Sequence, residues 1–497
     1  MNVEELPIIP LPILEIRCGG NYTITKDLTI YSEEKFSKLA QYLQKILSAK
    51  IGWKVPIIKK QTDQDQIVII ENDDAHLPFE GYVVNNGLDC LYISGVSPNG
   101  IFYGIQTLRQ IIKKDENGSW VIPNVIVRDY PRFGWRGFML DEARHFMGKE
   151  VVKKLLDLMA LHKLNKFHWH LVDDQGWRIE IKKYPKLTSI GSKREIKAKR
   201  GEQPISENEP MYGGFYTQED IKEIVAYAKE RFIEVIPEIE LPGHSSSAVA
   251  SYPELSCSGK QIDVPTYWGI LSNLYCPGKK NVYKFLENVL SEIIKLFLSN
   301  IVHVGGDEVF KKNWRKCPDC QALMKKEGMQ HVKELHVHMT NHFVKFLKKK
   351  GKTLMGWGQI LDPKLEGDVI CQFWLGKKKE TYEHLRKDGK VVSSQMLHTY
   401  LDYPYSLISL KKAYEFEPIF PDLENDFHEN FLGLEAPLWT ERVVTLERLF
   451  YQAFPRLTAY AETGWTVKER KNYKRFLKRL LVFSKFLEEE GIVITAN

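Results

Sequence analysis

The chain has 497 residues, too many for one ordinary hydrophobic core, so we expect two or more domains. Hydrophobic residues make up 43% and charged residues 27%, as in ordinary globular proteins, and the net charge is only +6. Such a small excess of positive charge on a chain this long gives no argument for binding to nucleic acid or membrane. No stretch of ~18 apolar residues indicates a membrane span, so neither nucleic acid nor membrane is an expected partner.

The start of the chain does not resemble a secretory signal. Glu4 and Glu5 come early, and three prolines interrupt the apolar stretch before Arg17. The compartment therefore stays open between the cytoplasm and secretion with a leader that is not part of this sequence.

Residues 1–128 are expected to form a smaller α+β accessory domain. Short segments rich in Ile and Val predict strands, and apolar residues at helical spacing predict helices. Two of the strands flank an Asn-Gly turn and predict a hairpin. The expected strands are 28–31, 66–70, 82–85 and 91–94, and the expected helices are 37–47 and 100–112.

Residues 129–497 have a different pattern, in which short β-rich segments alternate with helical segments. Eight such strands over ~360 residues predict an α/β fold, a (β/α)8 TIM barrel with loop insertions. A doubly wound open sheet is the alternative, but no Gly-rich fingerprint follows the first strand. The expected strands are 137–140, 166–171, 232–237, 301–305, 353–356, 368–373, 390–393 and 432–436, and the clearest helices are 149–162, 217–231 and 282–298.

Two local features refine this prediction. Thr217 followed by Asp220 is typical of a helix N-terminus with an acidic residue three positions on. Residues 184–214 have little periodicity, so we expect a loop at the barrel rim.

Polar and aromatic residues follow the predicted barrel strands one after another. The active site of such a barrel lies at the carboxyl ends of its strands, so these side chains are expected to meet there. Any one of them alone would be read as a satisfied polar residue or a core aromatic. The strand ends carry Asp141, Glu142, Arg144, His145, His168, His170, Asp173, Glu238, Glu240, His244, Asp307, Glu308, Trp357, Trp374, Tyr400, Asp402, Trp439 and Glu441.

Asp307 and Glu308 are the centre of this set. A carboxylic acid that protonates a leaving glycosidic oxygen needs a raised pKa, and an adjacent carboxylate raises it by like-charge repulsion. Gly305 and Gly306 precede the pair and allow a sharp backbone turn. Adjacent residues at one strand end are poorly placed to flank a sugar ring as two catalytic carboxylates must. A 2-acetamido carbonyl oxygen of the substrate can then act as the nucleophile.

Three further features bear on this site. Trp357, Trp374 and Trp439 are expected to wall a sugar pocket, since aromatic faces pack against sugar C–H groups. His168 and His170 offer an alternative metal site, but no His ends the predicted fifth, sixth or eighth strand. We therefore expect neither a catalytic metal nor another cofactor.

The seven cysteines do not suggest a disulfide framework. Cys317 and Cys320 form one CxxC motif without a second pair, so the sequence does not predict a zinc site there. Cys257 and Cys276 could meet across a loop. The sequence leaves open whether either pair forms a disulfide.

Several motifs together resemble the β-N-acetylhexosaminidases of glycoside hydrolase family 20. The resemblance is strongest over residues 128–465, and the Gly100–Arg109 segment is similar to the accessory domain of that family. The motifs are Arg132-Phe-Gly-Trp-Arg-Gly with Asp141-Glu-Ala-Arg-His, Asn165-Lys-Phe-His-Trp-His-Leu-Val-Asp-Asp-Gln-Gly-Trp-Arg, Pro237-Glu-Ile-Glu-Leu-Pro-Gly-His and His303-Val-Gly-Gly-Asp-Glu.

This resemblance implies substrate-assisted retaining hydrolysis of a terminal N-acetylhexosamine from an oligosaccharide or glycoconjugate. Glu308 matches the acid/base of the family, Asp307 the group that orients the acetamido N–H, and Tyr400 the donor to its carbonyl. Asp173 and His244 match a supporting pair. The implied sugar-binding residues are Arg144, Asp402 and Glu441 for the hydroxyls and Trp357, Trp374 and Trp439 for the pocket wall.

One residue departs from the family pattern. Gln359 stands where an acidic residue often follows Trp357, which puts in doubt the contacts of this loop on the leaving-group side. A metal-dependent barrel hydrolase and a sugar-binding protein without turnover stay open as alternatives. The choice between N-acetylglucosamine and N-acetylgalactosamine, the linkage and the oligomeric state are also open.

Overall fold

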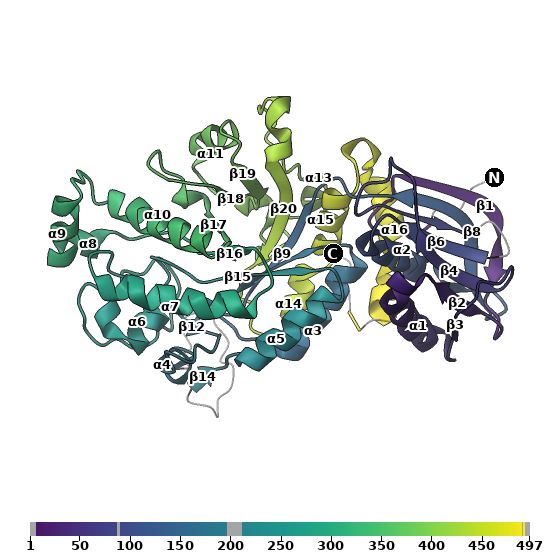
Figure 1. Ribbon diagram of the computed structural model, residues 1–497, viewed down its shortest axis with the longest axis horizontal. Coiled ribbons are helices and arrows are strands. Elements are labelled where there is room, and N and C mark those ends of the chain that lie inside the picture. The colour runs from purple at the N-terminus through teal and green to yellow at the C-terminus, as the bar shows by residue number, and fades with distance from the viewer. Residues whose placement is uncertain (1–5, 87–89, 196–210, 490, 493–497) are drawn as a thin grey trace. The chain divides into compact units, whose positions relative to one another are not determined.

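The structure is a computed structural model that describes residues 6–86, 90–195, 211–489 and 491–492. The chain divides into two compact units (Figure 1). The first comprises Met1–Arg136, Leu158–Leu164 and Phe454–Asn497, and the second comprises Gly137–Asp157 and Asn165–Ala453. Each compact unit is therefore built from more than one stretch of the chain, and no single position separates the two units.

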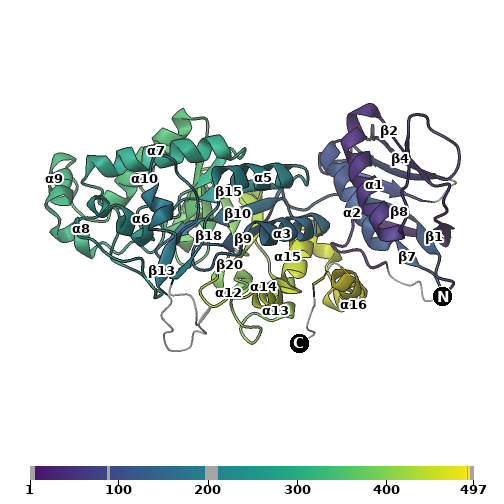
Figure 2. The same ribbon diagram turned by 90° about the horizontal axis from the view of Figure 1, so that it is seen from below.

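The first unit contains a mixed sheet in the order β1-β8-β5-β6-β4-β2-β3, with β7 added beside β8. The helices α1 (Ser37–Ile51) and α2 (Pro98–Ile111) pack against this sheet (Figure 2). The Ser97 side chain caps α2 by accepting from the Gly100 amide. The strands are β1 Leu14–Thr23, β2 Thr29–Ser32, β3 Ile57–Ile58, β4 Gln66–Glu71, β5 Tyr82–Asn85, β6 Cys90–Gly95, β7 Lys113–Lys114 and β8 Trp120–Asp129.

The second unit is built around a closed barrel of parallel strands, in the order β10-β15-β16-β17-β18-β19-β20-β9. Closure of the sheet excludes the doubly wound alternative, and every barrel strand predicted from the sequence is confirmed. The strands are β9 Trp135–Asp141, β10 Lys166–His170, β15 Glu234–Glu238, β16 Ile301–His303, β17 Thr353–Trp357, β18 Val369–Phe373, β19 Lys390–Ser393 and β20 Phe431–Leu438.

Helices separate most of the barrel strands along the chain. The predicted capping box at Thr217 is confirmed, since its side chain and that of Asp220 bond each other's backbone amides. The helices that follow α2 are α3 Lys149–Leu161, α4 Lys186–Ser189, α5 Gln218–Lys229, α6 Ser246–Ser251, α7 Lys280–Leu296, α8 Lys312–Lys316, α9 Pro318–Lys326, α10 Glu334–Lys349, α11 Lys378–Leu385, α12 Met396–Thr399, α13 Leu410–Glu415, α14 Leu446–Ala453, α15 Arg456–Trp465 and α16 Tyr473–Glu489.

The expected loop at 184–214 is more ordered than its sequence suggests. Besides α4, it contains the paired strands β13 (Lys193–Glu195) and β14 (Met211–Gly213), and residues 196–210 lie outside the described residues. Segments this short have no readable periodicity, which is why the sequence did not predict them. Among the described residues, no helix is long and apolar enough to cross a membrane.

Candidate active site

Side chains from the carboxyl ends of the barrel strands surround one cavity of about 220 Å³. This volume is smaller than the ~300–1,000 Å³ typical of sites for drug-sized ligands and suits a single sugar unit. Of the residues to which the sequence assigned a catalytic or sugar-binding role, all except Trp357 line it. The lining residues are Arg144, Asp173, Glu240, His244, Asp307, Glu308, Trp374, Tyr400, Asp402, Tyr403, Trp439 and Glu441.

The turn after β16 presents Asp307 and Glu308. Gly305 and Gly306 have φ values of +62° and +92°, and Glu308 itself adopts +48°, a conformation that a residue with a side chain rarely takes. A Cβ atom on Gly305 would lie 1.7 Å from a carboxylate oxygen of Glu240, so glycine is required there. The turn leaves the Asp307 side chain 11% exposed and that of Glu308 32% exposed.

Asp307 is buried beside a second group that suits an amide ligand. Burial, more than repulsion from Glu238 and Glu308, raises the pKa of Asp307 to about 6, although His244 opposes the shift. Its Oδ1 atom is buried and has no hydrogen-bond partner among the described residues. Burial and the charge of Asp307 raise the pKa of Tyr400 well above its usual value, so its hydroxyl stays protonated. The pair can accept a hydrogen bond from an amide N–H and donate one to its carbonyl oxygen.

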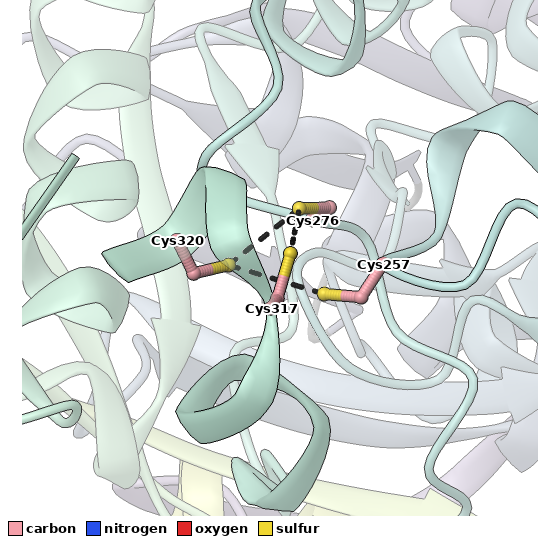
Figure 3. A group of neighbouring side chains, drawn as sticks. All are labelled: Cys257, Cys276, Cys317 and Cys320. Atoms are coloured by element: carbon pink, nitrogen blue, oxygen red, sulfur yellow. Dashed lines mark hydrogen bonds between the residues drawn. The ribbon is translucent and has the colours of Figure 1, made fainter. Parts of the chain in front are cut away.

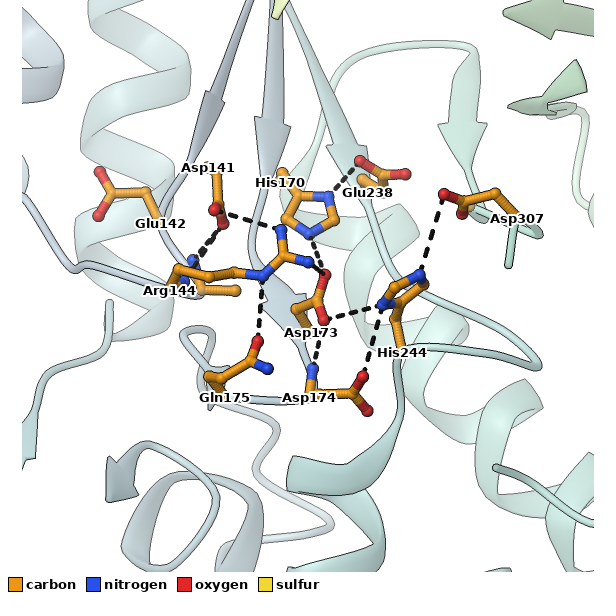
Figure 4. Close-up of polar contacts among 12 residues, drawn as sticks. Asp141, Glu142, Arg144, His170, Asp173, Asp174, Gln175, Glu238, His244 and Asp307 are labelled. Atoms are coloured by element: carbon orange, nitrogen blue, oxygen red, sulfur yellow. Dashed lines mark hydrogen bonds and ion pairs between the residues drawn. The ribbon is translucent and has the colours of Figure 1, made fainter. Parts of the chain in front are cut away.

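Asp173 is the centre of a buried charge network (Figure 4). Its carboxylate lies 2.7 Å from the Arg144 guanidinium, 3.0 Å from Nε2 of His170 and 3.1 Å from Nδ1 of His244. Burial raises the pKa of Asp173, but these partners outweigh it and keep the pKa far below the usual range. The other ring nitrogen of His244 lies 3.6 Å from Glu308 and 3.9 Å from Asp307. The predicted pair of Asp173 and His244 thus contacts both central carboxylates.

His168 and His170 contact carboxylates inside the barrel. The His168 ring nitrogens lie 2.7 Å from Glu435 and 3.0 Å from Glu238, and Nδ1 of His170 lies 2.5 Å from Glu238. Glu238 also lies 2.7 Å from Nδ1 of His303. The ligand atoms of His168, Glu238 and His303 are also close enough to one another to hold an ion.

Trp357 lies behind the cavity wall. Its indole N–H donates to Glu238 at 2.8 Å, and its side chain is fully buried. The centroid of its ring lies 5.8 Å from that of Trp439 and 6.5 Å from that of Trp374, and both of these residues line the cavity. Trp357 therefore supports the aromatic wall instead of forming its surface.

Two lining residues were given no specific role from the sequence: Glu240, which was expected only to lie at a strand end, and Tyr403. Burial and the charge of Asp307 raise the pKa of Glu240 well above its usual value, which favours the protonated acid. Glu240 ends a predicted barrel strand, and Tyr403 directly follows Asp402. Position near a strand end was thus the signal by which the sequence could have identified these two residues. Their burial and neighbouring charges depend on the fold and could not be predicted.

A second cavity of about 530 Å³ shares Glu308 and Trp374 with the first. Gln359 lines it and accepts a hydrogen bond from the Trp374 indole at 2.7 Å. The residue that departs from the family pattern therefore holds a ring that lines both cavities. Both cavities open to Glu308, so a group held in either one can reach this carboxylate.

Comparisons with known proteins agree with this fold. Residues 133–468 match the catalytic domain of glycosyl hydrolase family 20, and residues 5–130 match domain 2 of that family. The chain is similar to a beta-hexosaminidase of Porphyromonas gingivalis, with 37% identity over 96% of this chain and 62% of that protein. It is also similar to a beta-hexosaminidase of Akkermansia muciniphila, with 32% identity over 96% of this chain and 94% of that protein.

Solved structures are similar over nearly the whole chain. A family 20 exo β-N-acetylglucosaminidase from Vibrio harveyi, in complex with N-acetylglucosamine, aligns with a TM-score of 0.89 and 32% identity, covering 99% of this chain and 78% of that one. A family 20 β-N-acetylhexosaminidase from Streptomyces coelicolor aligns with a TM-score of 0.86 and 29% identity, covering 99% and 98%. The chain therefore belongs to glycosyl hydrolase family 20. It spans 62% of the length of the Porphyromonas relative.

Proposed function

We propose that this protein is an exo-acting β-N-acetylhexosaminidase that removes a terminal non-reducing N-acetylhexosamine from β-glycosides. The observation that carries this proposal is the small cavity in which the buried Asp307 lies beside Tyr400 while Glu308 is more exposed. Asp307 and Tyr400 suit an acetamido group, and Glu308 suits a glycosidic oxygen.

The proposed reaction has two steps. Glu308 protonates the glycosidic oxygen while the acetamido carbonyl oxygen of the substrate attacks the anomeric carbon, so the bond to the leaving group breaks as an oxazolinium ring closes. Asp307 accepts the amide N–H and stabilises the developing positive charge, and the Tyr400 hydroxyl donates to the carbonyl oxygen. Water then opens the ring as Glu308 takes back a proton, and two inversions retain the anomeric configuration.

The state of other cavity carboxylates supports a nucleophile on the substrate. The raised pKa of Glu240 favours its protonated form, which is a poor nucleophile. Asp173 is held by Arg144, His170 and His244. We assign Asp402 and Glu441 to the sugar hydroxyls, as their family counterparts suggest, together with Arg144, which lies 3.8 Å from Glu441.

We assign the second cavity to the leaving group, because it begins at Glu308, the proposed acid. The Vibrio harveyi structure is described with N-acetylglucosamine, which makes this sugar the first candidate for the terminal residue. N-acetylgalactosamine differs from it at a single hydroxyl and is the second.

A panel of chromogenic β-glycosides tests the activity. We expect turnover of N-acetylglucosaminides or N-acetylgalactosaminides and very poor turnover of the matching glucosides and galactosides, which lack the attacking carbonyl. A thiazoline that mimics the cyclised intermediate is expected to inhibit strongly, since it resembles the state that the site stabilises. Binding of these sugars without hydrolysis would instead indicate a sugar-binding protein.

A trapping experiment tests the nucleophile. The enzyme is treated with a 2-deoxy-2-fluoro glycoside that carries a good leaving group, and the intact protein is analysed by mass spectrometry. We expect no covalent adduct. A stable adduct on an Asp or Glu would demonstrate a protein nucleophile and overturn the substrate-assisted mechanism, even if the substrate preference were as proposed.

A further inference from the structure

Four cysteines converge in the second unit on segments outside the sugar cavity. Cys257 follows a short 3-10 helix (Pro253–Leu255), Cys276 precedes α7, and Cys317 and Cys320 lie at the start of α9 (Figure 3). All four are free thiols, three of them buried and Cys257 partly exposed. The CxxC motif that has no second pair in the sequence thus acquires two further cysteines through the fold.

The sulfur positions suit a tetrahedral ion. The Sγ atom of Cys276 lies 3.6 Å from that of Cys317 and 3.5 Å from that of Cys320, and the Cys257 and Cys320 sulfurs are 3.9 Å apart. All four lie within 4.8 Å of one another. A tetrahedron of sulfurs bound at the ~2.3 Å typical of zinc has edges of about 3.8 Å. The cysteines therefore form one cluster of four instead of two separate pairs.

Backbone contacts bring these segments together independently of the sulfurs. Ser256 and Tyr275 form an antiparallel bridge, and the Cys276 amide donates to the Leu255 carbonyl at 2.9 Å. A Cβ atom on Gly278 would lie 2.3–2.5 Å from the backbone of Asp319 and Cys320, so this close approach requires glycine. The cluster is therefore part of a defined loop packing.

Backbone groups of α9 and of Gly278 also lie close to the sulfurs. Cys320 lies in the first turn of α9, where the helix dipole stabilises negative charge. The Gly278 backbone N–H contributes a hydrogen bond to the sulfurs of Cys276 and Cys320. Such outer contacts commonly orient metal ligands.

We propose that Cys257, Cys276, Cys317 and Cys320 bind one structural Zn²⁺ ion. Four thiolates in a tetrahedron fill the coordination sphere, so no position is left for water or substrate and the site is not catalytic. Binding displaces the thiol protons to solvent and transfers no electrons. This inference does not depend on the proposed function.

The ion would hold in place a loop that leads to the sugar cavity. Residues 258–275 lie between two of its ligands, and within them the Tyr267 carbonyl accepts a hydrogen bond of 2.7 Å from the Gln175 side chain. Gln175 in turn accepts one of 3.0 Å from Arg144, which lines the cavity. The other two ligands end the segment that begins with Asp307 and Glu308. Zinc would therefore stabilise both loops against the barrel.

Metal analysis of the full chain tests this proposal. The protein is purified under reducing conditions without chelator, and its metals are measured by plasma mass spectrometry. We expect about one zinc per chain, released when a mercurial reagent titrates the thiols. Cys276→Ser and Cys320→Ser should lose this zinc and melt at a lower temperature. Cys371→Ser, which alters a buried cysteine of β18 outside the cluster, should keep it.

A second measurement keeps the test decisive if the serine variants fail to fold. Wild-type protein depleted of metal and loaded with Co²⁺ should develop the visible absorption of a tetrahedral cobalt thiolate site. The proposal would be overturned by four titratable thiols without zinc after equilibration with Zn²⁺. Iron in place of zinc, or a disulfide-linked pair of these cysteines in the isolated protein, would overturn it equally.

Discussion

Asp173 lies 3.1 Å from Nδ1 of His244, so a buried carboxylate holds the imidazole that faces Glu308. Burial lowers the pKa of His244, but Asp173 outweighs it and raises this pKa well above the usual value. At neutral pH the ring is therefore a cation within 4 Å of both central carboxylates. We therefore propose that His244 and Asp173 position the acid and the acetamido site.

Asp173→Asn tests this relationship. The change leaves Arg144 and two imidazoles without their shared buried anion, so we expect a loss of about 3–5 kcal/mol in the free energy of unfolding. The pKa of His244 should fall, so a limb of the pH–rate profile that depends on the His244 cation should move to lower pH. Denaturant unfolding and pH–rate profiles are the measurements. Asp368→Asn, at a side chain that is 98% exposed, is the control. A lower stability with an unshifted profile would leave Asp173 with only a structural role.

Glu308→Gln should reduce hydrolysis of an unactivated disaccharide by ~10²–10⁴-fold, the usual contribution of general acid catalysis. The loss should be smaller for aryl glycosides with acidic leaving groups, which need little protonation. Comparison of kcat/KM for the two kinds of substrate measures this difference. Glu327→Gln, at the C-terminal cap of α9, is a matched control that should behave like wild type. Near-wild-type turnover of the disaccharide would remove Glu308 from the acid role.

Asp307 should give the enzyme an acid limb, because its carboxylate must be ionised to stabilise positive charge and its pKa is raised to about 6. We expect kcat/KM to fall as the pH drops below about 6. Asp307→Asn should be slower and should lose this limb. A limb that persists in the variant would belong to another group.

The same shift predicts an effect of Asp307 on stability. A raised pKa means that the folded chain binds a proton more tightly than the unfolded chain, so the contribution of Asp307 falls as pH rises from about 4 to 6. Asp307→Asn should therefore increase the free energy of unfolding at pH 7 by up to about 3 kcal/mol, and the melting temperature should rise accordingly. Equal melting temperatures of the two proteins at pH 7 would contradict this expectation.

Gly305→Ala should disturb the turn that carries the two carboxylates. Its Cβ would lie 1.7 Å from Glu240, whereas Gly351, with φ of +70°, has nothing within 4 Å of the corresponding position. Gly351→Ala should thus cost only the ~1–2 kcal/mol of a left-handed backbone. We expect a larger loss of stability in Gly305→Ala and a fall in kcat, measured by thermal unfolding and initial rates. Equal effects of the two substitutions would show that the contact with Glu240 does not matter.

Local patterns in the sequence carried most of the fold prediction. Parallel barrel strands are buried on both faces and read as short, mostly apolar runs, so segments such as β17 and β18 could be recognised without the structure. Glycines before Asp307 and Glu308 likewise predicted a turn whose positive φ values are intrinsic to that segment. The position of polar residues at strand ends then identified nearly all of the cavity lining, because the strands of such a barrel share one active edge.

Other features depend on what the fold brings together from distant parts of the chain. Trp357 ends β17 and Trp374 directly follows β18, yet only packing decides that Trp357 lies behind the wall. The protonated state favoured for Glu240 results from burial near Asp307, which no local pattern records. Cys257 and Cys276 meet the CxxC motif because loops of the barrel bring distant segments into contact. The sequence by itself determined which elements form and where the chemistry is presented, since both follow from local spacing. Only the tertiary structure decided side-chain depth, charge environment and the cysteine cluster, since these arise from contacts between residues far apart in the chain.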